Sequence, residues 1–273
     1  MNMKHKRNLA LVGKILVGLI FILPVFIGIV YSFHPNADFA KGNLSLIPDN
    51  PTLENYIYIF KNVPTLSYFK NTLIVMLIAI PTQMVLNTIA AYAFSYYDFP
   101  GRNALFTVFL VSMMIPADVT IIANYITVQK LGLVDTHLGI ACTSLTGVTG
   151  IFMLRQSMLA LPRELFEAAK MDGCGKMRYL FRVVFPLCKP TISALAITSF
   201  IGLYGSYLWP TLVTTSNKYH TIQIGMANLI TGTGSRYGYV LAGAVVCMIP
   251  PLIAFIIGQD HIVSGMTAGS VKS

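Results

Sequence analysis

Six long runs of apolar residues constrain the fold of this chain more than any other feature. A helix that spans a bilayer needs about 20 mostly apolar residues, and its backbone hydrogen bonds must be made within the segment. The second, fifth and sixth runs carry no charged side chain. The runs therefore predict an all-α integral membrane protein with six transmembrane helices. They are approximately Leu9–Phe33, Thr72–Tyr96, Ala104–Tyr125, Leu138–Met158, Thr191–Thr214 and Tyr239–Gln259.

The charge content supports a membrane protein and argues against nucleic-acid binding. Only 11% of the 273 residues are charged, whereas soluble domains carry about 25%. The net charge of +9 does not indicate a nucleic-acid partner, because no soluble basic domain is present to bind one. Four cysteines occur without a C-x-x-C pattern or a cysteine–histidine cluster, so no metal site is predicted.

The distribution of Lys and Arg predicts the orientation in the membrane. With both termini in the cytoplasm, thirteen of the nineteen basic residues lie inside and six lie outside. Cytoplasmic loops collect positive charge, so this orientation in a bacterial plasma membrane is favoured. The first apolar run follows a basic start, as in a signal peptide, but it exceeds the usual signal length and no A-x-A cleavage site follows. We expect it to be retained.

These runs predict one membrane domain over residues 9–259, with residues 1–8 and 260–273 as cytoplasmic ends. An outer loop is expected at residues 34–67, with a short helix around Leu53–Phe60, and a second outer loop at Asn217–Gly238. The charged loop at residues 159–190 is expected in the cytoplasm.

The charged loop has the signals of a short helix. Pro162 suits a helix start, because its missing N–H needs no partner there. A carboxylate at Glu164 is favoured by the helix dipole, and Gly173 can adopt the left-handed conformation that closes a helix. We therefore predict a helix over Pro162–Asp172. A second is expected over Lys176–Val184, ended by prolines before the fifth span.

The same loop resembles the EAA loop of binding-protein-dependent ABC importer permeases. The family pattern is EAA, three residues, Gly, nine residues and Ile-x-Leu-Pro, and its spacing is complete here, with Val for Ile and Phe for Leu. The matching positions are Glu167, Ala168, Ala169, Gly173, Val183, Phe185 and Pro186. The resemblance implies a type I importer permease fold, in which this cytoplasmic coupling helix docks into a groove of an ATP-binding subunit.

In that family the glutamate pairs with a basic residue of the ATPase and the glycine permits the following turn. The coupling residues implied by the resemblance are Leu165, Phe166, Glu167, Ala168, Ala169, Asp172 and Gly173. The expected partners are a second homologous permease, two ATP-binding subunits, an extracellular solute-binding protein and the lipid bilayer. No P-loop occurs in this chain, so ATP and magnesium would be held by the partner ATPase, and the chain itself is expected to hold no cofactor and to be no enzyme.

Further segments resemble the carbohydrate-uptake branch of the family. YDFPGRN at Tyr97–Asn103 and YLWP at Tyr207–Pro210 occur in the family's order, and some segments resemble permeases of glycerol-3-phosphate importers. The C-terminal VSGMTAGSVKS resembles the tail of the maltose-type G subunit, which enters the space between the ATPases. The tail positions implied to make this contact are Gly265, Thr267, Gly269 and Lys272. The resemblance thus implies inward movement of a sugar or a glycerol-3-phosphate-like solute.

Polar and aromatic residues within the spans are candidates for the solute path. An ionisable group in a span is costly and often functional, although Asp118 also fits a carboxylate near the outer interface. The others fit interhelical hydrogen bonds or an aromatic belt equally well. The candidates are Asp118, Asn87, Tyr204, Tyr207 and Trp209.

Two other functions are disfavoured by the sequence. A self-sufficient secondary transporter is disfavoured because the six spans show no internal repeat and no proton-relay set beyond Asp118. A membrane enzyme is disfavoured because no pair of histidines has ligand spacing within a span and no nucleophile elbow occurs.

Overall fold

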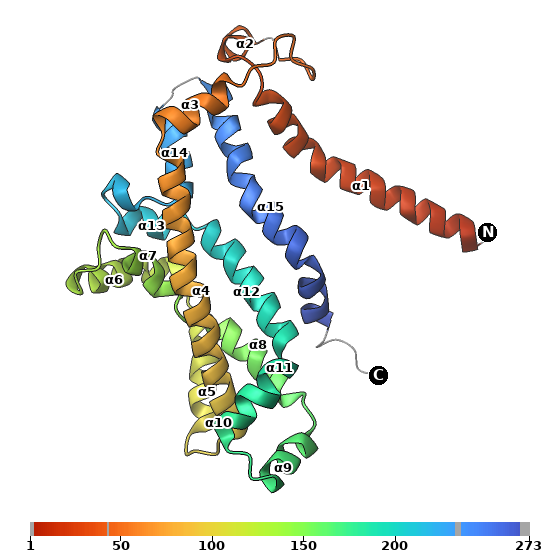
Figure 1. Cartoon of the computed structure of the whole chain (residues 1–273), viewed down its shortest axis with the longest axis vertical. Coiled ribbons are helices and arrows are strands. Elements are labelled where there is room, and N and C mark those ends of the chain that lie inside the picture. Colours follow the sequence, from red (N-terminus) through yellow and green to blue (C-terminus); the bar gives the residue numbers. More distant parts are fainter. Residues whose placement is uncertain (1–2, 43, 233–235, 268–273) are drawn as a thin grey trace. The chain divides into compact units, whose positions relative to one another are not determined.

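The computed structural model describes residues 3–42, 44–232 and 236–267, and every regular element within them is a helix (Figure 1). The chain forms two compact units. Unit 1 comprises Met1–Ser67 and Ile222–Ile249, and unit 2 comprises Tyr68–Thr221 and Pro250–Ser273. Two long helices, α4 (Thr65–Tyr96) and α15 (Tyr237–Thr267), each contribute to both units.

Unit 1 contains the N-terminal part of the chain and a segment near its C-terminal end. Ile59, Leu229, Tyr239 and Ala242 form its apolar core, and the rings of Tyr58 and Tyr239 stack at 3.8 Å. The remaining helices of this unit are α1 (Met3–Tyr31), α2 (Asn36–Lys41), α3 (Glu54–Asn62) and α14 (Ile222–Gly232). The predicted short helix around Leu53–Phe60 is confirmed by α3.

Unit 2 contains the remaining helices and the predicted functional loop. Its two apolar cores centre on Tyr92, Leu154 and Leu180 in one case and on Val75 and Ile140 in the other. The helices are α5 (Arg102–Ser112), α6 (Ala117–Lys130), α7 (His137–Ala141), η1 (Cys142–Ser144), α8 (Val148–Leu159), α9 (Arg163–Met171), α10 (Lys176–Tyr179), η2 (Leu180–Val184), α11 (Phe185–Leu187), α12 (Lys189–Tyr204), α13 (Leu208–Val213) and η3 (Asn217–Tyr219).

Among the described residues, three helices are long and apolar enough to cross a membrane, and the number of candidate spans is six when each of three bent helix pairs is counted as one span. The single segments are Leu11–Tyr31, Thr65–Tyr96 and Tyr237–Gln259. The bent pairs correspond to the third, fourth and fifth apolar runs. The first of these bends by 100° between α5 and α6, where Pro116 precedes the second helix, so its backbone cannot continue the first.

The other two bent pairs correct the predicted segment boundaries. The fourth run breaks before Gly147, with a bend of 47°. The fifth span begins earlier than predicted, because α10 to α11 joins α12 through a bend of 73°. The prolines there do not end the helical path, since Pro186 and Pro190 occupy first-turn positions, where no N–H is required. The run over Thr191–Thr214 is also divided, because α12 ends at Tyr204 and α13 follows.

The predicted outer loop at Asn217–Gly238 contains a helix, α14, that the sequence did not indicate. This helix is only 11 residues long, too short for a span and too rich in Gly and Thr for a strong helix signal. Burial of Ile222, Ile224 and Leu229 in the folded chain fixes it. Tertiary packing therefore overrides a weak local preference here.

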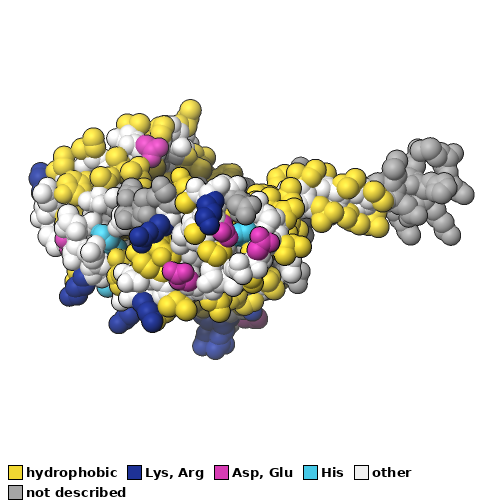
Figure 2. All heavy atoms as spheres, turned by 90° about the horizontal axis from the view of Figure 1, so that it is seen from above, with side chains coloured by type: hydrophobic (Ala, Val, Ile, Leu, Met, Phe, Trp, Pro, Cys, Tyr) yellow, Lys and Arg dark blue, Asp and Glu magenta, His cyan; other side chains and the backbone are white. Residues whose placement is uncertain are grey.

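Exposed apolar side chains surround α1 from Leu11 onward, as Figure 2 shows for the face in view. Phe21 in this helix is 76% exposed. A helix that is apolar all round is expected in lipid or against other apolar helices. This composition confirms the first apolar run as a candidate membrane helix.

Candidate functional site

The predicted loop helix is present as α9 and closes by a defined hydrogen-bonding pattern. Helical backbone begins at Arg163, one residue after Pro162, and ends at Met171. Gly173 has φ of 68°, in the left-handed region. Its N–H donates to the carbonyl of Lys170 at 3.1 Å, and the N–H of Cys174 donates to the carbonyl of Ala169 at 2.9 Å. This is the Schellman arrangement, in which the last free carbonyls of a helix are satisfied.

One face of α9 is anchored to unit 2 by aromatic contacts. The ring of Phe166 lies 5.4 Å from that of Tyr96 in α4 and 5.2 Å from that of Tyr179 in α10. Ala169, three residues further on, packs against the same apolar core, as does Cys174. Residues three apart share one face of a helix, so the short helix is held along its length against α4 and α10.

The remaining surface of α9 is exposed in the part of the chain that the structure describes. Met171 is 84% exposed and Leu165 is 39% exposed, and Glu164, Glu167 and Ala168 are also exposed. No ion pair of Glu167 is found among the described residues. An exposed carboxylate without an internal ion pair is available to a cationic group of another protein.

Tyrosines of α4 tie the anchored helix to the rest of the unit. The hydroxyl of Tyr92 donates to the carbonyl of Lys176 at 2.8 Å, and that of Tyr96 donates to the carbonyl of Met158 at 3.2 Å. The ammonium of Lys176 lies 4.0 Å from the ring centroid of Tyr97. The ends of α4, α8 and α10 are therefore linked, and displacement of α9 would be transmitted to all three.

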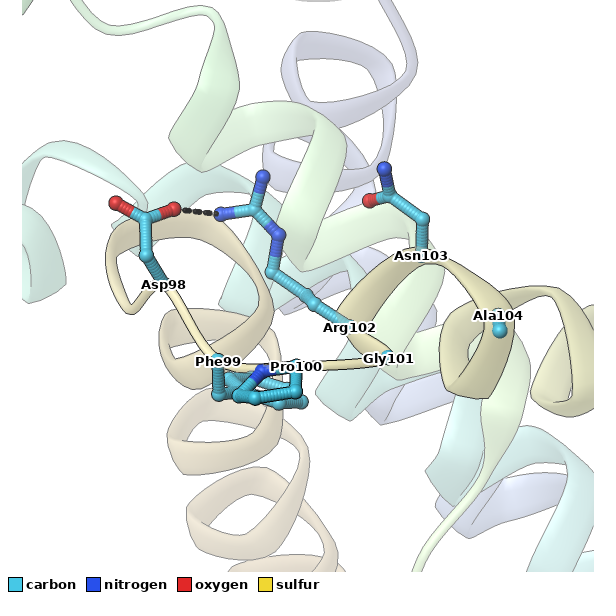
Figure 3. Close-up of a pocket in the computed structure, with 7 residues that line it drawn as sticks. All are labelled: Asp98, Phe99, Pro100, Gly101, Arg102, Asn103 and Ala104. Carbon is cyan, nitrogen blue, oxygen red and sulfur yellow. Dashed lines mark hydrogen bonds and ion pairs between the residues drawn. The ribbon is translucent and has the colours of Figure 1, made fainter.

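The turn from α4 to α5 lies at the same end of unit 2 as α9 (Figure 1). Figure 3 shows Arg102 reaching back across this turn to Asp98, with a distance of 2.9 Å between guanidinium and carboxylate. The guanidinium also donates to the carbonyl of Tyr97 at 3.1 Å. Gly101, with φ of 77°, gives the turn the left-handed residue that it needs. The YDFPGRN segment thus forms a tight, internally bonded turn.

A polar cavity of about 270 Å³ lies between α4, α12 and the break that precedes α8. The hydroxyl of Ser199 donates to the side-chain oxygen of Gln83 at 2.6 Å, across α12 and α4. Hydroxyl groups of Thr143, Ser144, Thr146 and Ser206 also line the space, with Gly202 and Leu203. Hydroxyl and amide groups of this kind can exchange hydrogen bonds with a polyhydroxylated solute.

The structure separates the predicted path residues into two groups. Trp209 lines a smaller cavity of about 50 Å³ that shares Thr143 and Ser206 with the larger one, and its Nε1 donates to the carbonyl of Ile140 at 3.1 Å. Asn87 is 1% exposed, and its oxygen accepts bonds from Thr146 Oγ1 at 3.0 Å and from the Gly147 N–H at 3.1 Å. Asn87 therefore braces the cavity wall.

The other three predicted path residues do not line either polar cavity. Tyr204 is buried and stacks on Phe200 at 5.9 Å, Tyr207 is exposed, and Asp118 is exposed in the first turn of α6. The spacing of Ser199 and Gly202 in α12 indicates the cavity face, because residues three apart share one side of a helix. Ser206 follows the end of α12, so only the tertiary structure brings it to the same cavity.

No group of three metal-ligating side chains occurs in the part of the chain that the structure describes. For the C-terminal tail, Gly265 and Thr267 fall in the backbone of α15, and Gly269 and Lys272 lie outside the described residues.

Sequence comparison relates most of the chain to transport proteins. Residues 87–268 match the family described as the binding-protein-dependent transport system inner membrane component. The arabinooligosaccharides transport system permease protein AraQ of Halalkalibacterium halodurans is 32% identical, with 96% of this chain and 95% of AraQ covered. The sn-glycerol-3-phosphate transport system permease protein UgpE of Rhizobium meliloti is 29% identical, with 97% and 98% covered.

Structural comparison gives the same fold. A chain of a bacterial ABC transporter that imports the acidic polysaccharide alginate superposes with a TM-score of 0.82, at 21% identity, covering 95% of this chain and 98% of that one. A second structure, of the bacterial alginate ABC transporter in complex with an alginate pentasaccharide-bound periplasmic protein, gives a TM-score of 0.61 at 15% identity, with 98% of each chain covered.

Proposed function

Because this chain belongs to the family of binding-protein-dependent transport system inner membrane components and has the type I ABC importer permease fold, we propose that it moves a sugar or a glycerol-3-phosphate-like solute inward by alternating access. Its relatives transport arabinooligosaccharides in one case and sn-glycerol-3-phosphate in another. The energy comes from ATP hydrolysis on separate subunits, which hold the ATP and magnesium.

The single observation that carries this proposal is the two-sided character of α9. Phe166 and Ala169 pack against the apolar core of unit 2, while the side chains of Leu165, Glu167 and Ala168 are exposed. In this role the exposed face docks on the ATP-binding subunit, with a basic residue of that subunit opposite Glu167. The coupling set also includes the cap formed by Asp172 and Gly173.

The anchoring contacts give the coupling step a physical route. When ATP closes the ATPase dimer, the docked α9 is displaced, and the Phe166 contacts pass the displacement to Tyr96 and Tyr179. The Tyr92 and Tyr96 hydroxyls then link it to α10 and α8. Packed interiors transmit such displacements because they have low compressibility.

The solute path in this proposal runs beside the polar cavity of unit 2. Gln83, Ser199 and Thr143 present amide and hydroxyl groups there, with Trp209 in the smaller neighbouring cavity. Asn87 supports the wall, and Asp118, Tyr204 and Tyr207 are assigned no direct contact with solute.

The complete transporter would contain a second homologous permease, two ATP-binding subunits and an extracellular solute-binding protein. The alginate transporter, whose chain is similar in fold, is known in complex with a periplasmic protein. Both termini lie in the cytoplasm in this assignment, following the thirteen-to-six division of basic residues. The tail residues Gly265, Thr267, Gly269 and Lys272 then extend toward the ATPase subunits.

The decisive experiment is uptake with Glu167→Lys in the complete transporter. Reversal of this exposed charge should abolish uptake and uncouple ATP hydrolysis, while the amount of protein in the membrane stays the same. Lys170→Glu, at an exposed position on the same helix, is the matched charge reversal and should have a smaller effect.

Wild-type uptake by the Glu167→Lys variant would remove the docking role from α9. Proton- or sodium-driven accumulation of a solute by liposomes holding this chain alone would replace the importer-subunit assignment by a secondary transporter.

A further inference from the structure

A cavity of about 380 Å³ lies where the end of α4, the α4–α5 turn, the end of α8 and the start of α9 meet. The coupling role described above uses one of its lining residues, Glu167. Three arginines also line it: Arg102, Arg155 and Arg163. The cavity therefore has more cationic than anionic side chains, since Asp98 is the one other carboxylate among the lining residues.

Asp98 does not neutralise the interior of this cavity. Its side chain is 98% exposed, and it pairs with Arg102 across the turn, as Figure 3 shows. An exposed pair of this kind contributes little energy, because water screens both charges. Of the other charged lining residues, Arg155 and Arg163 are cationic and Glu167 is anionic, so the wall keeps a net positive charge. Arg102 can also turn from its weak exposed pair to a bound anion.

Arg155 is the unusual member of this group. It projects from α8, which belongs to one of the bent helix pairs that are candidate membrane spans, and its side chain is half-buried. Its guanidinium carbon lies 4.2 Å from the centroid of the Phe106 ring, and its Nε donates to the carbonyl of Phe94 at 3.4 Å. Within the described residues neither recorded partner is an anion, and a cation near the apolar region of a membrane is costly without one.

The cavity also opens beside apolar side chains of the membrane-spanning helices. Leu159 lines it and is 49% exposed, and Phe94 and Met158 form part of the wall. Leu105 and Phe152, on the α5 and α8 helices, are exposed as well. A ligand with an anionic group and a hydrocarbon chain would satisfy both the arginines and this surface, whereas an inorganic anion would satisfy only the arginines.

We propose that this cavity binds the phosphate of an anionic phospholipid at Arg155 and Arg102, with an acyl chain along the exposed apolar side of α5 and α8. Basic pockets between membrane helices hold lipid headgroups in this way. Arginine suits the role because its planar guanidinium can donate two hydrogen bonds to one phosphate. The site adjoins α9, so the bound lipid would lie against the coupling helix.

The test is native mass spectrometry of the purified full-length chain in detergent, titrated with phosphatidylglycerol or phosphatidylcholine. We expect phosphatidylglycerol to be retained in preference to phosphatidylcholine. Arg155→Gln should weaken its retention about tenfold, the size expected for loss of one charged hydrogen-bonding group. Arg155→Lys should retain more than Arg155→Gln, and Arg178→Gln, an exposed position outside the cavity, should match the wild type.

Several outcomes would overturn the lipid site. These are equal retention of the two lipids, unchanged phosphatidylglycerol binding in Arg155→Gln, and displacement of the lipid by millimolar inorganic phosphate, which would indicate a free-anion site. Loss of ATPase-subunit co-purification in Arg155→Gln with lipid binding intact would assign the arginine to a protein contact. If Arg155→Gln does not elute as a folded monodisperse protein, Arg102→Gln provides the same comparison.

Discussion

Removal of the Phe166 ring should release α9 from unit 2 while the rest of the unit stays folded. The ring is half-buried against Tyr96 and Tyr179. A phenylalanine buries about 150–250 Å² when fully covered, so about 100 Å² of contact is lost here, worth roughly 2.5 kcal/mol. That free energy corresponds to a rise of about 30- to 100-fold in the population with α9 detached.

Hydrogen exchange of the α9 amides in purified Phe166→Ala measures this population. A helix of nine residues is marginal in water by itself, so its protection depends on the anchoring contacts. Exchange at residues 167–172 should accelerate by about the same 30- to 100-fold factor, while amides in the middle of α4 keep their protection. Uptake by Phe166→Ala should also fall, because a helix α9 that is detached from unit 2 no longer moves it.

Leu165→Ala is the matched control, since Leu165 is on the exposed side of the same helix. It should leave exchange in α9 unchanged and reduce only the contact with the ATP-binding subunit. Equal exchange rates in Phe166→Ala and wild type would refute the anchoring role. Equal acceleration in both variants would show that helix propensity, rather than the aromatic contacts, controls α9.

Three further predictions concern the helix cap, the loop between α6 and α7, and the topology. Gly173 has φ of 68°, and a Cβ added there would meet no neighbouring atom within 4 Å. Gly173→Val should therefore destabilise the helix cap through its backbone conformation, by about 1–2 kcal/mol, and reduce uptake, whereas Gly173→Asn should be tolerated. Equal uptake by the two variants would show that the backbone conformation of Gly173 does not matter. Hydrogen bonds from Thr215 and Ser216 lower the pKa of Asp135 below its ordinary value of 3.8, so its contribution to stability is present above that value and is lost as the pH falls through the lowered pKa. Asp135→Asn should therefore have a lower melting temperature than the wild type near neutral pH, and the two melting temperatures should converge in acid. A difference in melting temperature that stays constant with pH would contradict this. On a cysteine-free background, a thiol at Ser45 should react from outside and one at Ser270 only after permeabilisation, and the reverse labelling would invert the proposed orientation.

Local sequence determined the helical character of the apolar runs and the limits of α9. Long uncharged runs have no stable alternative to helix in a bilayer, because every backbone group must be bonded internally. Pro162 and Gly173 act through their own backbone preferences, so the start and end of α9 follow from single residues. The observed helix differs from the predicted Pro162–Asp172 by one residue at each end.

The breaks within the spans were only partly visible in the sequence. Pro116 indicated the break in the third run, because proline restricts its own backbone and that of the preceding residue. The divisions before Gly147 and after Tyr204 have no comparable signal. They depend on contacts such as that of Asn87 with Thr146 and the Gly147 N–H, which joins segments about 60 residues apart.

Only the tertiary structure decided which side chains act together. The sequence places Phe166 beside Glu167 but does not tell which of them faces the protein, and the rings of Tyr96 and Tyr179 settle that assignment. It also contains Gln83, Ser199 and Thr143 without indicating that they share one cavity. A helix is specified by interactions within about four residues, whereas a cavity or an anchoring surface is specified by packing between segments that are distant in the chain.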